Sequence, residues 1–240
     1  MRPTVVLIPG TLCDERVFSR IKPRIGIYAS LKTVKLNSLS GKSDWVRGLL
    51  TDLPERTLIV GFSLGGMIAL EILRRAPDRV SGLALISSNA EPASRTHRMK
   101  RQRLSDRMHR FGLRSTCKSL KGSYFLSARN AARHKGVVMK MALRTQPARA
   151  LKQFKLAGHR ASGHPSLESF ERPVYLVAGQ QDHLCPPPLQ RRAAKSAPVS
   201  TLTLLPRCGH FAPLERPGLV SRALIEWIND VNSEVDHVHD

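Results

Sequence analysis

Short apolar runs alternate with segments of helical periodicity along most of the chain. Six runs rich in Val, Ile and Leu predict buried strands: residues 4–8, 29–36, 57–62, 80–87, 173–179 and 199–205. Four segments with apolar residues three or four apart predict helices: residues 44–53, 64–75, 187–196 and 216–231. Strands and helices in this alternation form a mostly parallel sheet with helices on both faces. The pattern therefore predicts an α/β fold with one strand for each of the six apolar runs.

One long interval interrupts this alternation, between the strand that ends near residue 87 and the strand that begins at residue 173. It divides the chain into a predicted core, residues 1–91 and 166–240, and an insert, residues 92–165. The insert has enough apolar side chains to dock amphipathic helices on the core: Leu104, Met108, Phe111, Leu120, Val137, Val138, Met141 and Leu151. We expect the insert to be helical.

The insert also holds most of the positive charge. The chain has 39 Lys and Arg against 18 Asp and Glu, and the insert alone contains 19 of the basic residues and one acid, Asp106. Its net charge is therefore +18, and that of the core is +3. Such a charge attracts anions, so an anionic substrate or an acidic carrier protein is a candidate partner. A solvated helical surface explains the same residues equally well. Nucleic acid is favoured less, because no recognised nucleic-acid-binding motif accompanies the charge.

The third predicted strand leads into a motif with chemical meaning. Ser63 follows it, and Gly61 and Gly65 flank the serine in the pattern Gly-x-Ser-x-Gly. Between a strand and a helix this pattern forms a sharp elbow, which needs small residues two before and two after the serine and lifts its hydroxyl above the sheet. The pattern alone occurs by chance, but its flanking segments supply the required context. Ser63 is therefore a candidate nucleophile.

A serine nucleophile needs a base and a carboxylate that orients the base, and both follow in the expected order. Asp182 comes three residues after the predicted strand 173–179, and His210 comes five residues after the strand 199–205. Functional groups of such sheets gather at the carboxyl ends of the strands. Each residue also has an ordinary interpretation, as a strand-end serine, a turn aspartate or a buried histidine. Their joint occurrence on these elements favours a catalytic triad.

The same segments resemble the serine α/β-hydrolase fold family, near its small carboxylesterases and carrier-protein methyl esterases. Residues 4–14 resemble the family's first conserved strand and oxyanion loop, residues 182–186 its acid loop, and residues 209–217 its histidine loop. The resemblance implies an α/β-hydrolase fold in which the insert is a helical cap. The family usually has His-Gly where this chain has Pro9-Gly10, and it opens with a hairpin where only residues 1–3 precede the first strand. We therefore expect a sheet trimmed to the six strands.

The resemblance also implies roles for residues near the triad. The backbone N–H groups of Leu64 and Thr11 would bind the oxyanion, with Leu12 as a weaker alternative to Thr11. Leu12 and Phe211 are expected to contact the substrate.

These observations predict a serine hydrolase, a carboxylic ester hydrolase that cleaves a small-molecule acyl ester or thioester through an acyl-enzyme intermediate. A carbon–carbon bond hydrolase, a lactonase or a perhydrolase would use the same triad. A non-catalytic binding protein that holds an anionic partner on the basic insert, such as acyl carrier protein or RNA, is a further alternative.

The sequence gives no sign of a cofactor, a metal site or a membrane span. It contains no phosphate-binding or dinucleotide-binding loop and no apolar run of membrane-spanning length. The four cysteines show no Cys-x-x-Cys spacing, and no secretory leader precedes the first strand, so a reduced, cytoplasmic protein is expected. Because Cys13, Cys185 and Cys208 flank the predicted catalytic loops, thiol reagents are expected to inhibit by crowding the site.

Overall fold

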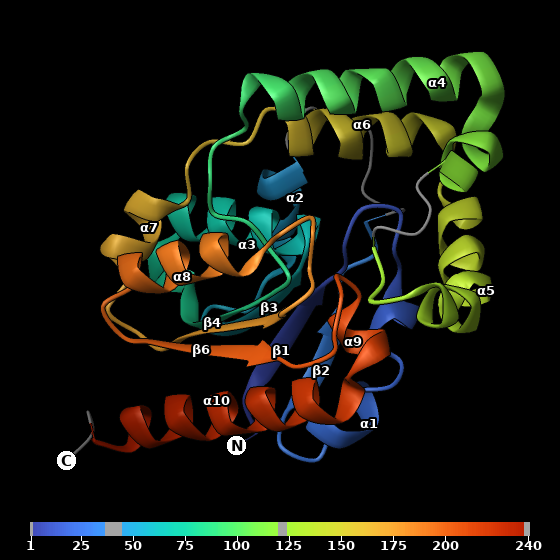
Figure 1. Cartoon of the computed structure of the whole chain (residues 1–240). Coiled ribbons are helices and arrows are strands. Elements are labelled where there is room, and N and C mark those ends of the chain that lie inside the picture. Colours follow the sequence, from blue (N-terminus) through green and yellow to red (C-terminus); the bar gives the residue numbers. More distant parts are fainter. Residues whose placement is uncertain (1, 37–44, 120–123, 238–240) are drawn as a thin grey trace.

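A six-stranded sheet forms the centre of the protein in the computed structural model, which describes residues 2–36, 45–119 and 124–237 (Figure 1). All neighbouring strands run parallel, in the order β2-β1-β3-β4-β5-β6. The strands are β1 (Thr4–Ile8), β2 (Ser30–Thr33), β3 (Thr57–Phe62), β4 (Val80–Ile86), β5 (Val174–Gly179) and β6 (Ser200–Leu205). Each predicted strand is present, within a few residues of its expected ends.

Helices cover both faces of this sheet because successive side chains of a strand point to opposite sides. Val60 and Val177 pack on one face, under a layer that includes Trp227, whereas Ile59 and Leu176 pack on the other. The first layer contains η1 (Glu15–Phe18), α1 (Lys22–Ile25), α9 (Ala212–Glu215) and α10 (Pro217–His237). The second contains α2 (Trp45–Asp52), α3 (Leu64–Arg75), α7 (His164–Glu168) and α8 (Pro187–Ser196). A short turn, η2 (Pro77–Arg79), joins α3 to β4.

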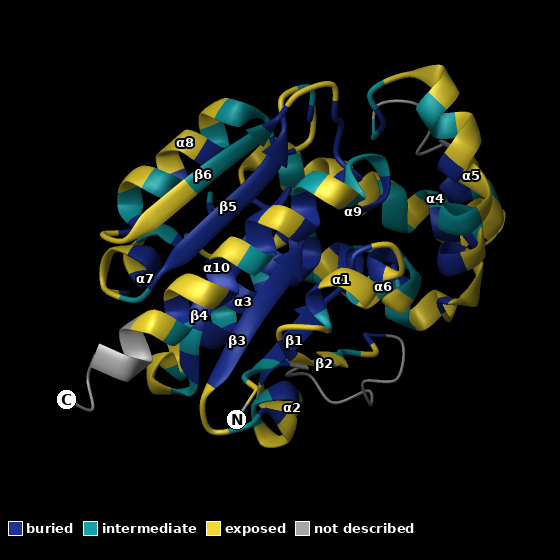
Figure 2. Cartoon of the chain, turned by 90° about the horizontal axis from the view of Figure 1, so that it is seen from below, coloured by how far each residue is buried: buried dark blue, intermediate teal, exposed yellow. Residues whose placement is uncertain are grey.

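Burial follows this layering. Figure 2 shows β3, β4 and β5 in dark blue, and all six residues of β3 and of β5 are buried. Strand β6 lies at one edge, and Ser200 and Thr201 are exposed there. Central parallel strands read as continuous apolar runs because both of their faces are covered. The apolar pattern therefore located them reliably.

Three helices lie in the chain between β4 and β5: α4 (Arg95–Ser119), α5 (Ala128–Arg144) and α6 (Pro147–Gly158). In Figure 1, α4 and α6 run side by side across the top of the view and α5 descends along one side. Gly112, at φ 75° and ψ 168°, breaks the helical path of α4. The expectation of a helical insert is met, and its boundaries as a separate domain, residues 92–165, stay a prediction.

Two predicted helices differ slightly at their ends from the observed ones. The predicted helix over residues 44–53 is α2, and residue 44 lies outside the described residues. The last helix continues to His237, six residues beyond its predicted end. In the described part of the chain, no helix is long and apolar enough to cross a lipid bilayer.

Candidate active site

The turn after β3 holds Ser63 in a backbone conformation that side-chain-bearing residues rarely adopt. Its φ is 52° and its ψ is −113°, between the last strand residue and the first residue of α3. A Cβ at Gly65 would run into the carbonyl oxygen of Ile8, and a Cβ at Gly61 would run into the backbone of Gly66. The glycines of the motif are therefore required by close backbone approach, and the serine is left at the tip of the turn.

Two hydrogen bonds from β4 and the residues after it hold this elbow in place. The N–H of Ser63 donates to the carbonyl oxygen of Ile86 at 2.9 Å. The hydroxyl of Ser88 donates to the carbonyl oxygen of Ser63 at 2.8 Å. Sequence analysis did not single out Ser88, although its place after a buried strand beside the motif is a usable signal. The elbow is thus fixed from the neighbouring strand.

The three sequence-predicted triad residues lie in one hydrogen-bonded chain. The Nε2 atom of His210 is 2.9 Å from the Oγ atom of Ser63, and its Nδ1 atom is 2.9 Å from Oδ2 of Asp182. A carboxylate only accepts hydrogen bonds, so Nδ1 carries the proton and Nε2 is the acceptor for the serine hydroxyl. Asp182 and His210 are buried, and Ser63 is partly exposed. This arrangement can remove the serine proton.

The environment of Asp182 keeps its carboxylate ionised. Burial by itself raises the pKa of Asp182, but the charge and hydrogen bond of His210 outweigh it, together with two backbone donors. Oδ1 accepts the N–H groups of Leu184 at 2.8 Å and Cys185 at 2.9 Å. The net result is a pKa below the ordinary value, so Asp182 acts as an acceptor that orients the imidazole.

The loop after β1 and the first turn of α3 bring backbone N–H groups toward this site. The N–H of Leu64 lies at the start of α3, where a helix leaves its donors unpaired. Within the described residues, no hydrogen-bond acceptor faces the N–H of Leu64 or of Thr11. The N–H of Leu12 differs, since it donates to Oε1 of Gln153 at 2.7 Å. Of the two residues predicted as oxyanion donors in this loop, only Thr11 therefore has an N–H without an acceptor among the described residues.

The two residues expected to contact substrate are both buried, and Phe211 lies next to His210. Leu12, with φ 57°, packs into the apolar cluster of the insert. Phe211 stacks on Phe125 with ring centroids 4.9 Å apart and meets the ring of His210 edge-on at 5.9 Å. Their contact with a substrate stays a prediction.

Gln153, on α6, was missed by sequence analysis. It is fully buried and, as the acceptor for Leu12, ties the insert to the loop after β1. Its Nε2 atom is buried and has no partner among the described residues. The usable signal was a polar side chain on a helix face whose neighbours Ala150, Phe154 and Ala157 are apolar and buried.

The insert supplies further contacts to the histidine loop. The N–H of His210 donates to the carbonyl oxygen of Tyr124 at 2.8 Å. The carboxylate of Glu215 accepts the N–H of Leu126 at 3.0 Å and Nδ2 of Asn130 at 2.9 Å. These bonds fix the start of α5 against the loop that carries His210.

The cysteines near the site are unpaired and buried. Burial raises the pKa of Cys13 and of Cys208 to about 12. The thiolate is the reactive form, so thiol reagents should attack these residues slowly, which weakens the expectation that they inhibit by crowding the site. Ligand atoms of Asp182, Cys185 and His210 lie within 4.8 Å of one another, a spacing that suits a metal ion. Burial also raises the pKa of Cys185 well above its ordinary value, which disfavours the thiolate that a metal needs.

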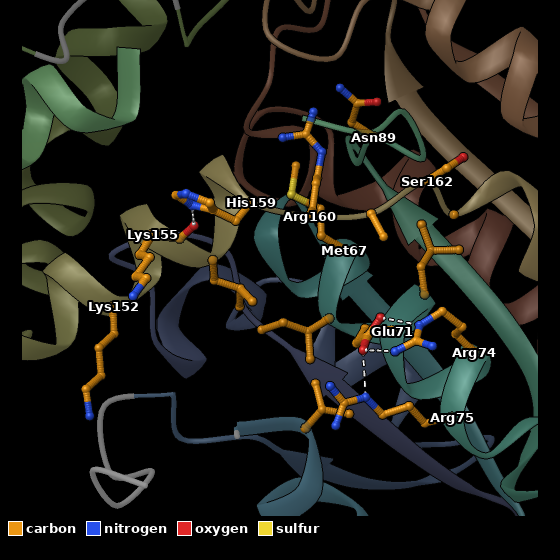
Figure 3. A pocket seen from close by; sticks show the side chains of 16 residues that line it. Met67, Glu71, Arg74, Arg75, Asn89, Lys152, Lys155, His159, Arg160 and Ser162 are labelled. Carbon is orange, nitrogen blue, oxygen red and sulfur yellow. Dashed lines mark hydrogen bonds and ion pairs between the residues drawn. The ribbon is translucent and has the colours of Figure 1, made fainter. Parts of the chain in front are cut away.

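A large cavity lies between α3 and α6 (Figure 3). Its volume is about 800 Å³, and none of the three triad residues lines it. On its wall Glu71 pairs with Arg74 at 2.6 Å and with Arg75 at 2.6 Å. Asn89 and Arg160 line the cavity away from this cluster.

Several known proteins share sequence with this chain. A pimeloyl-[acyl-carrier protein] methyl ester esterase of Aromatoleum aromaticum is 32% identical over 95 residues, which cover 37% of this chain and 38% of that protein. A biotin biosynthesis bifunctional protein BioHC of Cellvibrio japonicus matches over only 19% of its own length. The chain therefore spans less than two thirds of these relatives. A putative 2-succinyl-6-hydroxy-2,4-cyclohexadiene-1-carboxylate synthase of Bacillus subtilis is 25% identical over 80% of this chain and 76% of its own length.

Solved structures show the same fold at low sequence identity. A thermophilic esterase from Thermogutta terrifontis has a TM-score of 0.83 at 21% identity, over 95% of this chain and 90% of that one. MenH from S. aureus has a TM-score of 0.84 at 15% identity, over 96% and 94% of the two chains. The model of the alpha/beta hydrolase family matches residues 30–223. With the parallel sheet and the elbow in place, this match shows that the chain belongs to the alpha/beta hydrolase family.

Proposed function

We propose that the protein is a serine hydrolase that cleaves a carboxylic ester or thioester through an acyl-enzyme intermediate. The observation that carries the proposal is the hydrogen-bonded chain from Ser63 through His210 to Asp182, at a strained turn beside open backbone N–H groups. A nucleophile, a base, an orienting carboxylate and oxyanion donors are the parts that acyl transfer requires.

Each group has one task in the proposed reaction. His210 Nε2 takes the proton of Ser63 while Oγ attacks the carbonyl carbon of the substrate. The N–H groups of Leu64 and Thr11 donate to the oxyanion, which is the interaction that strengthens in the transition state. His210 then gives its proton to the departing oxygen or sulfur. Water, deprotonated by the same imidazole, releases the acid and restores Ser63.

The relatives support an acyl substrate. One matched protein is a methyl ester esterase for an acyl group on a carrier protein, and a structural neighbour is an esterase. The net charge of +18 on the insert suits an acidic carrier protein, which we retain as a proposed partner. A non-hydrolytic reaction is the second candidate, because the relative that matches 80% of this chain is named a synthase.

Hydrolysis of p-nitrophenyl esters from acetate to decanoate tests the proposal. We expect turnover by the wild type, and a loss of about a thousandfold or more in kcat for Ser63→Ala. Ser19→Ala, which removes an exposed hydroxyl, is the control and should keep full activity. The dependence of turnover on acyl chain length would then indicate how long an acyl chain the pocket accepts. Equal activity of wild type and Ser63→Ala, in folded protein, would exclude the serine mechanism.

A further inference from the structure

Two partly buried arginines of the insert meet no carboxylate in the described part of the chain. Arg101 lies on α4, where its side chain passes close to Gly158, and it forms no hydrogen bond or ion pair with a described residue. Arg160 follows α6 and donates from Nε to the carbonyl oxygen of Glu91 at 2.8 Å, and from Nη1 to that of Ala157 at 2.7 Å. Its Nη2 atom is buried and has no hydrogen-bond partner among the described residues. Donors of this kind normally have an acceptor when buried.

Glu91, the acid that acts on Arg160, has other partners for its carboxylate. The carboxylate of Glu91 is engaged by Arg192 at 2.8 Å and by His164 at 3.2 Å. Burial lowers the pKa of both Arg101 and Arg160, and the charge of Arg101 lowers that of Arg160 further. The two guanidinium groups therefore repel each other in a poorly solvated place. The bonds from Nε and Nη1 of Arg160 have a structural role, because they hold the end of α6. That role accounts neither for the buried Nη2 atom nor for the presence of Arg101 nearby.

Two observations connect these arginines with residues near the triad. Their charges act on the thiol of Cys185, which lies within 4.8 Å of the ligand atoms of Asp182 and His210. Arg101 also acts on Tyr124, whose ring centroid is 6.1 Å from that of His210.

The second observation is that Arg160 and Asn89 line the same cavity. Asn89 follows Ser88, whose hydroxyl binds the carbonyl oxygen of Ser63. Arg160 therefore lines a cavity whose wall includes the residue after Ser88, and Arg101 lies where α4 packs against the end of α6.

We propose that Arg101 and Arg160 form an anion subsite that binds a carboxylate or phosphate group of the substrate while its ester or thioester carbonyl lies at Ser63. The planar guanidinium fork matches either group with paired hydrogen bonds, and a partly desolvated ion pair of this kind is stronger than one at the surface. The inference rests on the proposed function and adds the substrate class to it. The anion has two sources: a terminal carboxylate on the acyl chain, or a phosphate on the arm that carries a thioester.

Matched substrates separate these sources. For the acyl side, the pair is mono-p-nitrophenyl glutarate, which ends in a carboxylate, and neutral p-nitrophenyl pentanoate. For the carrier arm, the pair is S-butyryl 4′-phosphopantetheine and S-butyryl pantetheine. The measured quantity is the ratio of kcat/KM for the anionic and neutral members, at constant ionic strength to hold long-range screening fixed. We expect the wild type to prefer the anionic member of at least one pair by about tenfold or more.

Charge-removing variants locate that preference. Arg101→Met and Arg160→Met should each reduce the ratio about tenfold. Arg103→Met removes the same charge from an exposed position on the same helix and should leave the ratio unchanged. If general attraction by the insert caused the preference, this variant would lower the ratio as much as the other two. Arg160 holds two backbone carbonyls, so its variant is vulnerable to misfolding. Arg101→Met breaks no such bond and keeps the test decisive.

The outcomes are distinct. A preference that falls in the Arg101 variant and not in the Arg103 variant supports the subsite. Serine-dependent hydrolysis with no anionic preference in either pair, or with an equal fall in all three variants, overturns the subsite and leaves the hydrolase in place. Absence of Ser63-dependent turnover on all four substrates overturns the proposed function and the subsite together.

Discussion

The core and the insert of this protein are built in different ways. Helices sandwich the parallel sheet of the core, and large buried side chains fill both of its faces. Among the described residues of the insert there is no strand, and α4, α5 and α6 pack around a small apolar cluster to which the core contributes Leu12. Charge differs as well, since the core carries +3 and the insert +18.

The proposed reaction assigns different tasks to the two regions. Ser63, Asp182 and His210 all come from loops at the carboxyl ends of core strands, where a rigid sheet fixes their spacing. The insert contacts the same region through Gln153, which accepts the N–H of Leu12, and through the carbonyl oxygen of Tyr124, which accepts the N–H of His210. We therefore expect core changes to alter the chemical step or global stability, and insert changes to alter substrate choice and the fine geometry of the site.

The largest expected effect is at the core carboxylate. Asp182→Asn should lower kcat about ten-thousandfold, because an amide in place of the carboxylate favours the wrong imidazole tautomer. Kinetics with a p-nitrophenyl ester measure it, and circular dichroism checks the fold. Asp106→Asn, an exposed change in the insert, is the control. A fall of less than about tenfold would show that Asp182 is not the orienting group.

Buried rings in the two regions should respond differently to truncation. Trp227 and Phe154 are both fully buried, in the core and in the insert. Trp227→Ala should reduce the free energy of unfolding by about 3–5 kcal/mol, measured by urea denaturation. Phe154→Ala should open the insert locally, so trypsin should cleave its Lys and Arg residues faster. The urea midpoint for unfolding of the core should change little in this variant. Equal shifts of a single midpoint in both variants would indicate one cooperative unit.

The hydrogen bond from Leu12 to Gln153, which joins the loop after β1 to the insert, should affect kcat less than Asp182 does. Gln153→Met keeps the side-chain length and removes the acceptor for the Leu12 N–H, so kcat should fall about tenfold with KM little changed. Gln153→Glu keeps an acceptor oxygen and loses the unpartnered Nε2 donor, so it should retain more activity than Met. If Gln153 has only a packing role, both variants would change thermal stability and leave kcat at the wild-type value.

The smallest effect concerns acid stability of the core. Because the pKa of Asp182 is lower in the folded protein than in the unfolded chain, its contribution is complete above the unfolded value and is lost as pH falls through the folded value. Urea midpoints should therefore fall below about pH 4, and fall less in Asp182→Asn, which lacks this titration. Parallel curves for wild type and variant would contradict the assignment.

Much of the core was predictable because its signals are local. A strand buried on both faces needs consecutive apolar residues, and β3 and β5 show such runs. The elbow needs glycine at positions 61 and 65, since any side chain there would collide with backbone. The order of Ser63, Asp182 and His210 along these strands then indicated the site. Fold class and family membership are confirmed by the sheet and the family match.

The sequence by itself determined the sheet, the elbow and the excess charge of the insert, because periodicity, steric demand and composition are properties of neighbouring residues. Tertiary structure decided which amide of the loop after β1 remains open, since the acceptor for Leu12 lies 141 residues away on α6. It also decided that Nη2 of Arg160, one of the 19 basic residues of the insert, is buried with no hydrogen-bond partner among the described residues. Long-range contacts of this kind depend on how helices pack, and a single sequence carries no local pattern for them.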